Sequence, residues 1–210
     1  MTVPPPLVLP SVAMAEHLLA GGAGVMPTDT LPALVASPAH AAQLWMLKQR
    51  PEDKPLILMA ATAEALLALV DPEAQVAARS LTQHHWPGAL TLVMPVALDE
   101  DAQAVLACLN PGSATLGLRV PASPQARDLL SRTGPLATTS ANPSGEVAAL
   151  NADQAQSYFP TVPLLGPLTW PEPQGVASTV LAWTARERWQ ILRQGAVMPA
   201  GVVDPPPCSG

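Results

Sequence analysis

The hydrophobic residues of this chain form short runs, separated by polar clusters, glycines and prolines. Runs of roughly four to eight apolar residues are typical of buried strands and short helices. Their alternation predicts a mixed α/β domain in which helices pack on a twisted sheet. The expected helices cover residues 11–20, 38–48, 62–70, 72–85, 124–132 and 152–158, and the expected strands cover residues 24–26, 56–60, 90–94, 114–120, 136–139, 179–183 and 189–193. Residues 99–101 are expected in a loop between two strands.

Helix boundaries follow from the capping residues. Ser11 and Thr62 are expected to cap helices, because a hydroxyl oxygen can accept from a free backbone N–H of the first turn. Ser37 and Ser123 each precede a proline, which favours the first helical position. The Gly21-Gly22 pair is expected to end the first helix.

The length of 210 residues suits one large domain. We expect a catalytic domain over residues 1–200 and a proline-rich tail over residues 201–210. Hydrophobic residues make up 49% of the chain, yet no run is long enough to suggest a transmembrane span. The start contains Pro4-Pro5-Pro6 and no basic region before an apolar stretch, so a signal peptide is not expected. A cytoplasmic location without membrane contact is the expectation.

The charge balance limits the kinds of partner. A formal net charge of -6 argues against an extended nucleic-acid surface, which usually needs a basic stripe. Any bound polyanion should therefore be small. Cys108 and Cys208 lack neighbours at ligand spacing, so neither a zinc site nor a disulfide framework is expected.

The scarce cations gather in one place. Lys48, Arg50 and Lys54 lie within seven positions of a chain that has ten Lys and Arg in all. Pro51 and Pro55 stiffen this turn, which follows an apolar helical run and precedes an apolar strand. The turn could bind a phosphate-bearing ligand, or its cations could simply complement the negative end of a helix.

A second polar segment lies at residues 135–145, where hydroxyl and amide side chains follow a short strand. Such a loop suits ribose hydroxyls, phosphate oxygens or a carboxylate, although it could also be an ordinary turn. Asp29, between two threonines, could be a general base, a metal ligand or part of a capping turn. Arg119 and Arg193 each follow an apolar run, so each needs an anion, either a protein carboxylate or a ligand.

Six motifs, taken in order, resemble the YrdC-type threonylcarbamoyl-adenylate synthase family: PTDT at 27–30, KQRPEDKPL at 48–56, WPGALTLV at 86–93, LGLRVP at 116–121, TTSANPSG at 138–145 and ILRQG at 191–195. The match covers most of the chain. The resemblance implies a single α/β domain with a twisted mixed sheet and flanking helices around a deep cavity. It also implies synthesis of threonylcarbamoyl-AMP and pyrophosphate from L-threonine, bicarbonate and ATP.

The resemblance further implies roles for individual residues. Lys48 and Arg50 would be catalytic and would contact the ATP phosphates. The other implied nucleotide-binding residues are Lys54, Thr115, Ser140, Asn142 and Arg193, and the implied threonine-binding residues are Thr30, Arg119 and Thr138. Mg²⁺ would enter with ATP, and the product would pass to a tRNA threonylcarbamoyl transferase complex.

Two departures from the family pattern concern the amino-acid pocket. Residues 31–34 read Leu-Pro-Ala-Leu instead of the common Tyr-Gly-Leu, and Met59 stands where some members have His. They leave open a paralogue of the same fold that acts on another nucleotide. A non-catalytic RNA-binding or ribosome-maturation module of the same fold, with weak tRNA or RNA contact, is a further alternative.

Overall fold

The computed structural model describes residues 6–49, 54–172, 175–184, 188–200 and 202. The described residues form a ten-stranded mixed sheet in the order β1-β8-β2-β3-β7-β4-β6-β5-β9-β10. The strands are β1 Val8–Leu9, β2 Ala23–Met26, β3 Ala33–Ala36, β4 Ile57–Met59, β5 Leu90–Pro95, β6 Thr115–Arg119, β7 Leu136–Ser140, β8 Leu164–Leu165, β9 Thr179–Trp183 and β10 Trp189–Arg193. The mixed α/β class predicted from the sequence is thereby confirmed.

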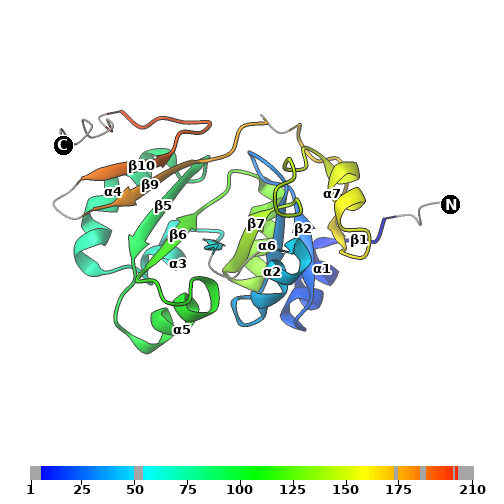
Figure 1. Cartoon of the computed structure of the whole chain (residues 1–210), viewed down its shortest axis with the longest axis horizontal. Coiled ribbons are helices and arrows are strands. Elements are labelled where there is room, and N and C mark those ends of the chain that lie inside the picture. Colours follow the sequence, from blue (N-terminus) through cyan, green and yellow to red (C-terminus); the bar gives the residue numbers. More distant parts are fainter. Residues whose placement is uncertain (1–5, 50–53, 173–174, 185–187, 201, 203–210) are drawn as a thin grey trace.

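The helices lie around this sheet. They are α1 Ser11–Leu19, the 3₁₀ turn η1 Pro38–His40, α2 Ala42–Lys48, α3 Ala63–Leu67, α4 Pro72–His85, α5 Glu100–Leu109, α6 Pro124–Thr133 and α7 Ala152–Tyr158. Figure 1 shows α1, α2, α6 and α7 grouped near β2 and β7, whereas α3, α4 and α5 lie near β5 and β6. No helix in the described part combines the length and the apolar character needed to cross a membrane.

Two buried clusters hold the layers together. The larger contains side chains such as Leu44, Leu58 and Leu92, and the smaller joins α1 and α6 through residues such as Met14 and Leu129. All five of these side chains are fully buried. Burial of this kind supplies the main favourable term in folding.

The cap predicted at Thr62 is confirmed, since Thr62 Oγ1 accepts from the Ala65 nitrogen. The helix start predicted at Ser123-Pro124 is also confirmed, and there Ser123 Oγ accepts from the Ala126 nitrogen at 3.3 Å. Gly21 follows the end of α1 with a φ of 96°, a backbone conformation that favours glycine.

Other boundary predictions were wrong. Ser11 is the first residue of α1 and makes no cap, because Pro10 occupies the capping position. The helix expected over residues 38–48 is divided into η1 and α2. Residues 99–101 do not form a loop: Asp99 Oδ1 accepts from the Ala102 nitrogen at 2.9 Å and caps α5.

Strand β3 was not predicted. Its four residues are all buried and apolar, so the run has no polar alternation to mark it as a strand. It pairs antiparallel with β2 on one side and with β7 on the other, and it places Ala33 opposite Ser140. This pairing brings residues 30–33 beside the polar end of β7.

Candidate active site

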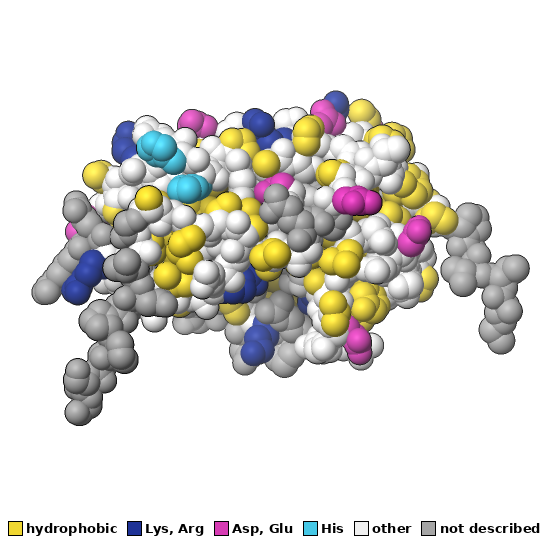
Figure 2. Space-filling model, turned by 90° about the horizontal axis from the view of Figure 1, so that it is seen from above, with side chains coloured by type: hydrophobic (Ala, Val, Ile, Leu, Met, Phe, Trp, Pro, Cys, Tyr) yellow, Lys and Arg dark blue, Asp and Glu magenta, His cyan; other side chains and the backbone are white. Residues whose placement is uncertain are grey.

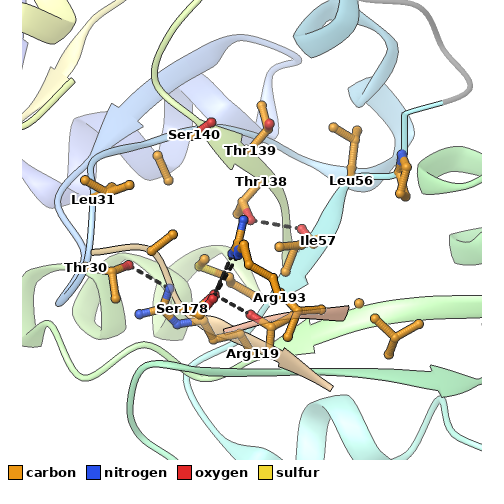
Figure 3. A pocket seen from close by; sticks show the side chains of 18 of the residues that line it. Thr30, Leu31, Leu56, Ile57, Arg119, Thr138, Thr139, Ser140, Ser178 and Arg193 are labelled. Atoms are coloured by element: carbon orange, nitrogen blue, oxygen red, sulfur yellow. Dashed lines mark hydrogen bonds between the residues drawn. The ribbon is translucent and has the colours of Figure 1, made fainter. Parts of the chain in front are cut away.

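A cavity of about 510 Å³ opens on one face of the sheet, within the size range usual for small-molecule sites. Segments from across the chain contribute to its wall, including the residues before β3, strands β4, β6 and β7, and the β9–β10 pair. Figure 3 shows Arg119 and Arg193 close to Ser178 on one side, with Thr139 and Ser140 on the other side in this view.

Strand β6 shows how the sheet separates core from cavity. Thr115, Gly117 and Arg119 line the cavity, whereas the intervening Leu116 and Leu118 are buried in the larger core cluster. This is the period-two alternation of a strand with one face packed and one face toward a ligand space. Gly117 leaves that space open, because a Cβ there would come within 3.3 Å of Ile57.

All three nitrogens of the Arg119 guanidinium donate hydrogen bonds to described residues. Its guanidinium donates through Nε to the Gly88 carbonyl at 2.9 Å, through Nη1 to Thr30 Oγ1 at 2.8 Å, and through Nη2 to Asp29 Oδ1 at 2.8 Å. Asp29 Oδ1 also accepts from the Ala122 nitrogen. The sequence required an anion for Arg119, and the structure supplies the carboxylate of Asp29.

These bonds leave part of the guanidinium unused by the described residues. Once these bonds are counted, one N–H remains on each terminal nitrogen of Arg119 that a ligand oxygen could accept. The side chain is only 2% exposed, yet it lines the cavity.

The charges around Arg119 favour a bound anion. Burial lowers the pKa of the Arg119 guanidinium, the pairing with Asp29 opposes that change, and the positive charge of Arg193 adds to it. The described residues that line the cavity include these two arginines and no Asp or Glu. The site therefore has excess positive charge that a ligand can neutralise.

Arg193 is held differently. Its Nη2 donates to the Ser178 carbonyl at 2.9 Å and contacts Ser178 Oγ at 3.2 Å, and Nε donates to the same carbonyl. Ser178 Oγ in turn lies 2.9 Å from Thr91 Oγ1. Among the described residues no carboxylate pairs with Arg193, so the internal ion pair considered for it is not found.

Lys48 lies beside the polar loop that follows β7. Its Nζ donates to the Ser140 carbonyl and to Asn142 Oδ1, the latter at 3.1 Å. Ser140 Oγ donates to the same Asn142 oxygen at 2.6 Å. Lys48 and the hydroxyl-and-amide segment, separated by about ninety positions of sequence, are therefore neighbours in space.

Six of the sequence-predicted site residues line the cavity: Thr30, Thr115, Arg119, Thr138, Ser140 and Arg193. Lys48 and Asn142 lie directly behind Ser140. Lys54 is exposed, and its carbonyl accepts from Trp45 Nε1 at 2.9 Å. Arg50 lies outside the described residues, as do Cys208 and most of the predicted tail.

Outside the predicted polar segment at 135–145, three polar cavity residues were missed from the sequence: Thr91, Asn110 and Ser178. A signal for Ser178 existed, because Ser178 and Thr179 stand at the entry of an apolar strand, as Thr138 and Thr139 stand near the end of another. Asn110 lies at the end of α5, in the segment that was expected to be a loop, and its amide donates to the Thr115 carbonyl at 2.9 Å.

The side chains of the site determine whether the protein itself could hold a metal ion. The described residues contain no group of three or more His, Cys, Asp or Glu side chains that could hold a metal ion. The polar side chains of the cavity wall carry hydroxyl, amide and guanidinium groups, and a guanidinium attracts anions instead of cations.

Fold and site together define an α/β protein with a cationic cavity for a small anionic ligand. Residues 16–195 match the Sua5/YciO/YrdC family model, which is described as "Telomere recombination". Because this match spans most of the chain, the protein belongs to the Sua5/YciO/YrdC family.

Named relatives agree with that assignment. The chain is 34% identical over 148 residues to the threonylcarbamoyl-AMP synthase of Marinobacter nauticus, covering 69% of this chain and 75% of the relative. It is 32% identical over 197 residues to a putative threonylcarbamoyl-AMP synthase of Mycobacterium leprae, covering 92% and 86%.

A solved structure shares the fold. The crystal structure of P. abyssi Sua5 complexed with L-threonine matches with a TM-score of 0.76 and 29% identity, over 87% of this chain and 53% of that one. This chain therefore spans about half the length of the P. abyssi protein.

Proposed function

We propose that this protein is a threonylcarbamoyl-AMP synthase, which converts L-threonine, bicarbonate and ATP to threonylcarbamoyl-AMP and pyrophosphate. The observation that carries the proposal is that Arg119, Arg193 and Ser140 surround one cavity whose described lining contains no carboxylate. The names of the relatives support the same activity.

The amino acid is proposed to bind at Arg119. One remaining N–H on each terminal nitrogen suits the threonine carboxylate, and the nearby hydroxyls of Thr30 and Thr138 suit its polar groups. Both hydroxyls belong to buried threonines. The P. abyssi relative was crystallised with L-threonine, which supports this class of ligand for the family site.

The nucleotide is proposed to occupy the rest of the cavity. Ser140 and Thr115 offer hydroxyls, and Arg193 offers a fixed cation. The family resemblance adds Arg50 and Lys54 as proposed contacts of the nucleotide. A cation already anchored by Ser178 loses little side-chain entropy when a phosphate binds.

The chemistry needs positioning more than it needs a protein nucleophile. Bicarbonate takes up a proton and loses water to give carbon dioxide, and the amine of threonine adds to it and releases a proton to give a carbamate. A carbamate oxygen then attacks the α-phosphorus of ATP in line, and pyrophosphate leaves. The described cavity wall contains no His, Cys, Asp, Glu or Lys. Fixed cations and hydrogen-bond donors can stabilise the charge that develops in such a transfer.

Mg²⁺ is proposed to arrive with ATP. The cavity wall gives it no described carboxylate, so the phosphates and water would supply its ligands. The metal would neutralise phosphate charge, while Arg193 would orient the nucleotide from the protein side.

The product is proposed to pass to a tRNA threonylcarbamoyl transferase. Direct RNA binding by this chain finds little support, because the formal net charge is -6. Figure 2 shows Lys and Arg side chains scattered in small groups on the viewed face.

Pyrophosphate release tests the proposal. Purified protein with L-threonine, bicarbonate and Mg-ATP should release pyrophosphate, and omission of threonine or substitution of Arg119→Ala should reduce that release to background. Release at the same rate without threonine, or none above an enzyme-free control, would reject the function.

A further inference from the structure

Lys48 contacts three positions of the loop that follows β7. Its Nζ donates to the Ser140 carbonyl and to Asn142 Oδ1, and it lies 3.4 Å from Ser140 Oγ. Its own carbonyl accepts from the Ser144 nitrogen at 2.9 Å. One residue at the end of α2 thus contacts alternate residues of the loop through both its side chain and its backbone.

The environment of Lys48 fits an internal position better than a ligand contact. The residue is only 2% exposed and does not belong to the described cavity wall, whereas Ser140 does. A buried ammonium needs acceptors, and the Ser140 carbonyl and the Asn142 amide oxygen supply them. Lys48 therefore lies behind the residue that faces the ligand space.

The loop also depends on contacts of its own. Asn142 Nδ2 donates to the carbonyls of Pro143 and Glu146, at 2.9 Å and 2.7 Å. Its Oδ1 accepts from both Ser140 Oγ and Lys48 Nζ. Since this one oxygen links the cavity-facing hydroxyl to the buried cation, loss of the cation should alter the orientation of Ser140.

The end of α2 is itself held firmly. Gln49 has a φ of 50°, a left-handed conformation that ends the helix immediately after Lys48. Trp45, one turn earlier, is 4% exposed and donates to the Lys54 carbonyl beyond the turn. Lys48 is thus presented to the loop from a fixed helix end.

We propose that Lys48 is a positioning residue, which fixes the Ser140–Asn142–Ser144 loop for the nucleotide and acts through that loop instead of contacting the phosphates. This inference rests on the proposed synthase function for its kinetic consequence. Its structural consequence, order in the loop without any ligand, is independent of the reaction.

Hydrogen exchange on the ligand-free protein tests the structural consequence. Lys48→Met keeps the length and the apolar stem but removes the donors. Exchange in peptides covering residues 140–149 should become about tenfold faster, because charge-assisted bonds to the loop are lost. Arg132→Met is the matched control, since Arg132 is exposed on α6 and pairs with the exposed Asp128; it should leave this loop unchanged.

Kinetics test the functional consequence. If Lys48 acts through Asn142, the double variant Lys48→Met with Asn142→Ala should lose about as much kcat/KM as the more impaired single variant. The opposite result would be a loss of kcat/KM in the double variant equal to the product of the two single losses, with unchanged loop exchange in ligand-free Lys48→Met. That result would show an independent contact of Lys48 with the nucleotide and would overturn the proposal.

Two further outcomes are also decisive. If Lys48→Met does not fold, as fast exchange across the whole chain would show, ligand-free Asn142→Ala takes its place. Faster exchange confined to residues 140–149 then supports the proposal, and unchanged exchange overturns it.

If the wild-type protein releases no pyrophosphate, the synthase assignment fails while the exchange result still decides whether Lys48 orders the loop.

Discussion

Asp29 Oδ1 lies 2.8 Å from Arg119 Nη2, across ninety positions of sequence. The same oxygen accepts from the Ala122 nitrogen, so one carboxylate connects the segment before β3 with the segment after β6. Arg119 lines the cavity, whereas Asp29 does not belong to the described lining. The ion pair therefore both stabilises the fold and fixes a cation of the site.

Removal of the Asp29 carboxylate should be costly. Asp29→Ala leaves the Arg119 guanidinium buried without a counterion, which is expected to reduce the free energy of unfolding by about 3–5 kcal/mol. Urea denaturation of the ligand-free protein measures the change. Asp128→Ala, which breaks an exposed pair with Arg132, is the control and should cause a much smaller loss. Equal losses would mean that the Asp29 pair is not specially important for stability.

Arg193 offers a second test of the site. Its guanidinium is anchored to Ser178 and has no described carboxylate partner, so its charge is available to a ligand. Arg193→Ala should lower kcat/KM for ATP by about ten- to a hundredfold, the value of a charge-assisted contact. Steady-state pyrophosphate release measures the effect. Arg188 is exposed, and the control variant Arg188→Ala should keep the wild-type kcat/KM for ATP. A similar loss of kcat/KM in this control would indicate a non-specific effect of charge.

Gly117 tests the cavity itself. The Cβ of a larger residue would come within 3.3 Å of Ile57 Cγ1 and 3.7 Å of Thr91 Cγ2, on the cavity face of β6. Gly117→Val should weaken ATP binding by at least about tenfold, while the smaller Gly117→Ala should have an intermediate effect. Calorimetric titration measures affinity, and thermal unfolding checks that both variants remain folded. Wild-type affinity in a folded Gly117→Val protein would place the nucleotide elsewhere.

Much of the fold could be predicted because local chemistry specifies it. Thr62 and Ser123 cap their helices through hydroxyl contacts within three residues, which a sequence displays directly. Strand β3 could not be recognised, because burial on both faces removes the alternation that marks a strand. The acidic residues at 99–101 suggested a loop, although acidic groups also favour the first turn of a helix, and here they begin α5.

Several residues of the site could be named from the sequence, but their contacts with one another could not. An arginine after an apolar run requires an anion, so the need of Arg119 was evident, but its partner lies ninety positions away and only the fold brings Asp29 to it. Ser178 has a local signal at the entry of a strand, but its contacts with Thr91 and Arg193 arise from the pairing of β9 with β5 and with β10. Long-range pairing, which no local pattern encodes, completes the cavity.

Met59 is the residue most relevant to the choice of amino acid. It is 5% exposed, lines the cavity, and is paired in register with Arg119 on the neighbouring strand β6. Because Arg119 is the proposed carboxylate anchor, an apolar neighbour one strand away should contact the rest of the amino acid. A pocket wall of this kind distinguishes one methyl group by about ten- to a hundredfold or slightly more.

We therefore expect L-threonine to be preferred over L-serine by at least about tenfold in kcat/KM, and Met59→Ala to reduce this preference with little change in KM for ATP. Parallel pyrophosphate-release assays with the two amino acids measure the ratio, and the exposed Met46→Ala on α2 provides the matched control for loss of a methionine. A wild-type preference for serine or glycine would mean that the apolar wall selects a different substrate from that of the named relatives. An unchanged ratio in Met59→Ala would instead place the side chain of the amino acid away from Met59, and would make Leu31 and Ala33, which also line the cavity, the next residues to substitute.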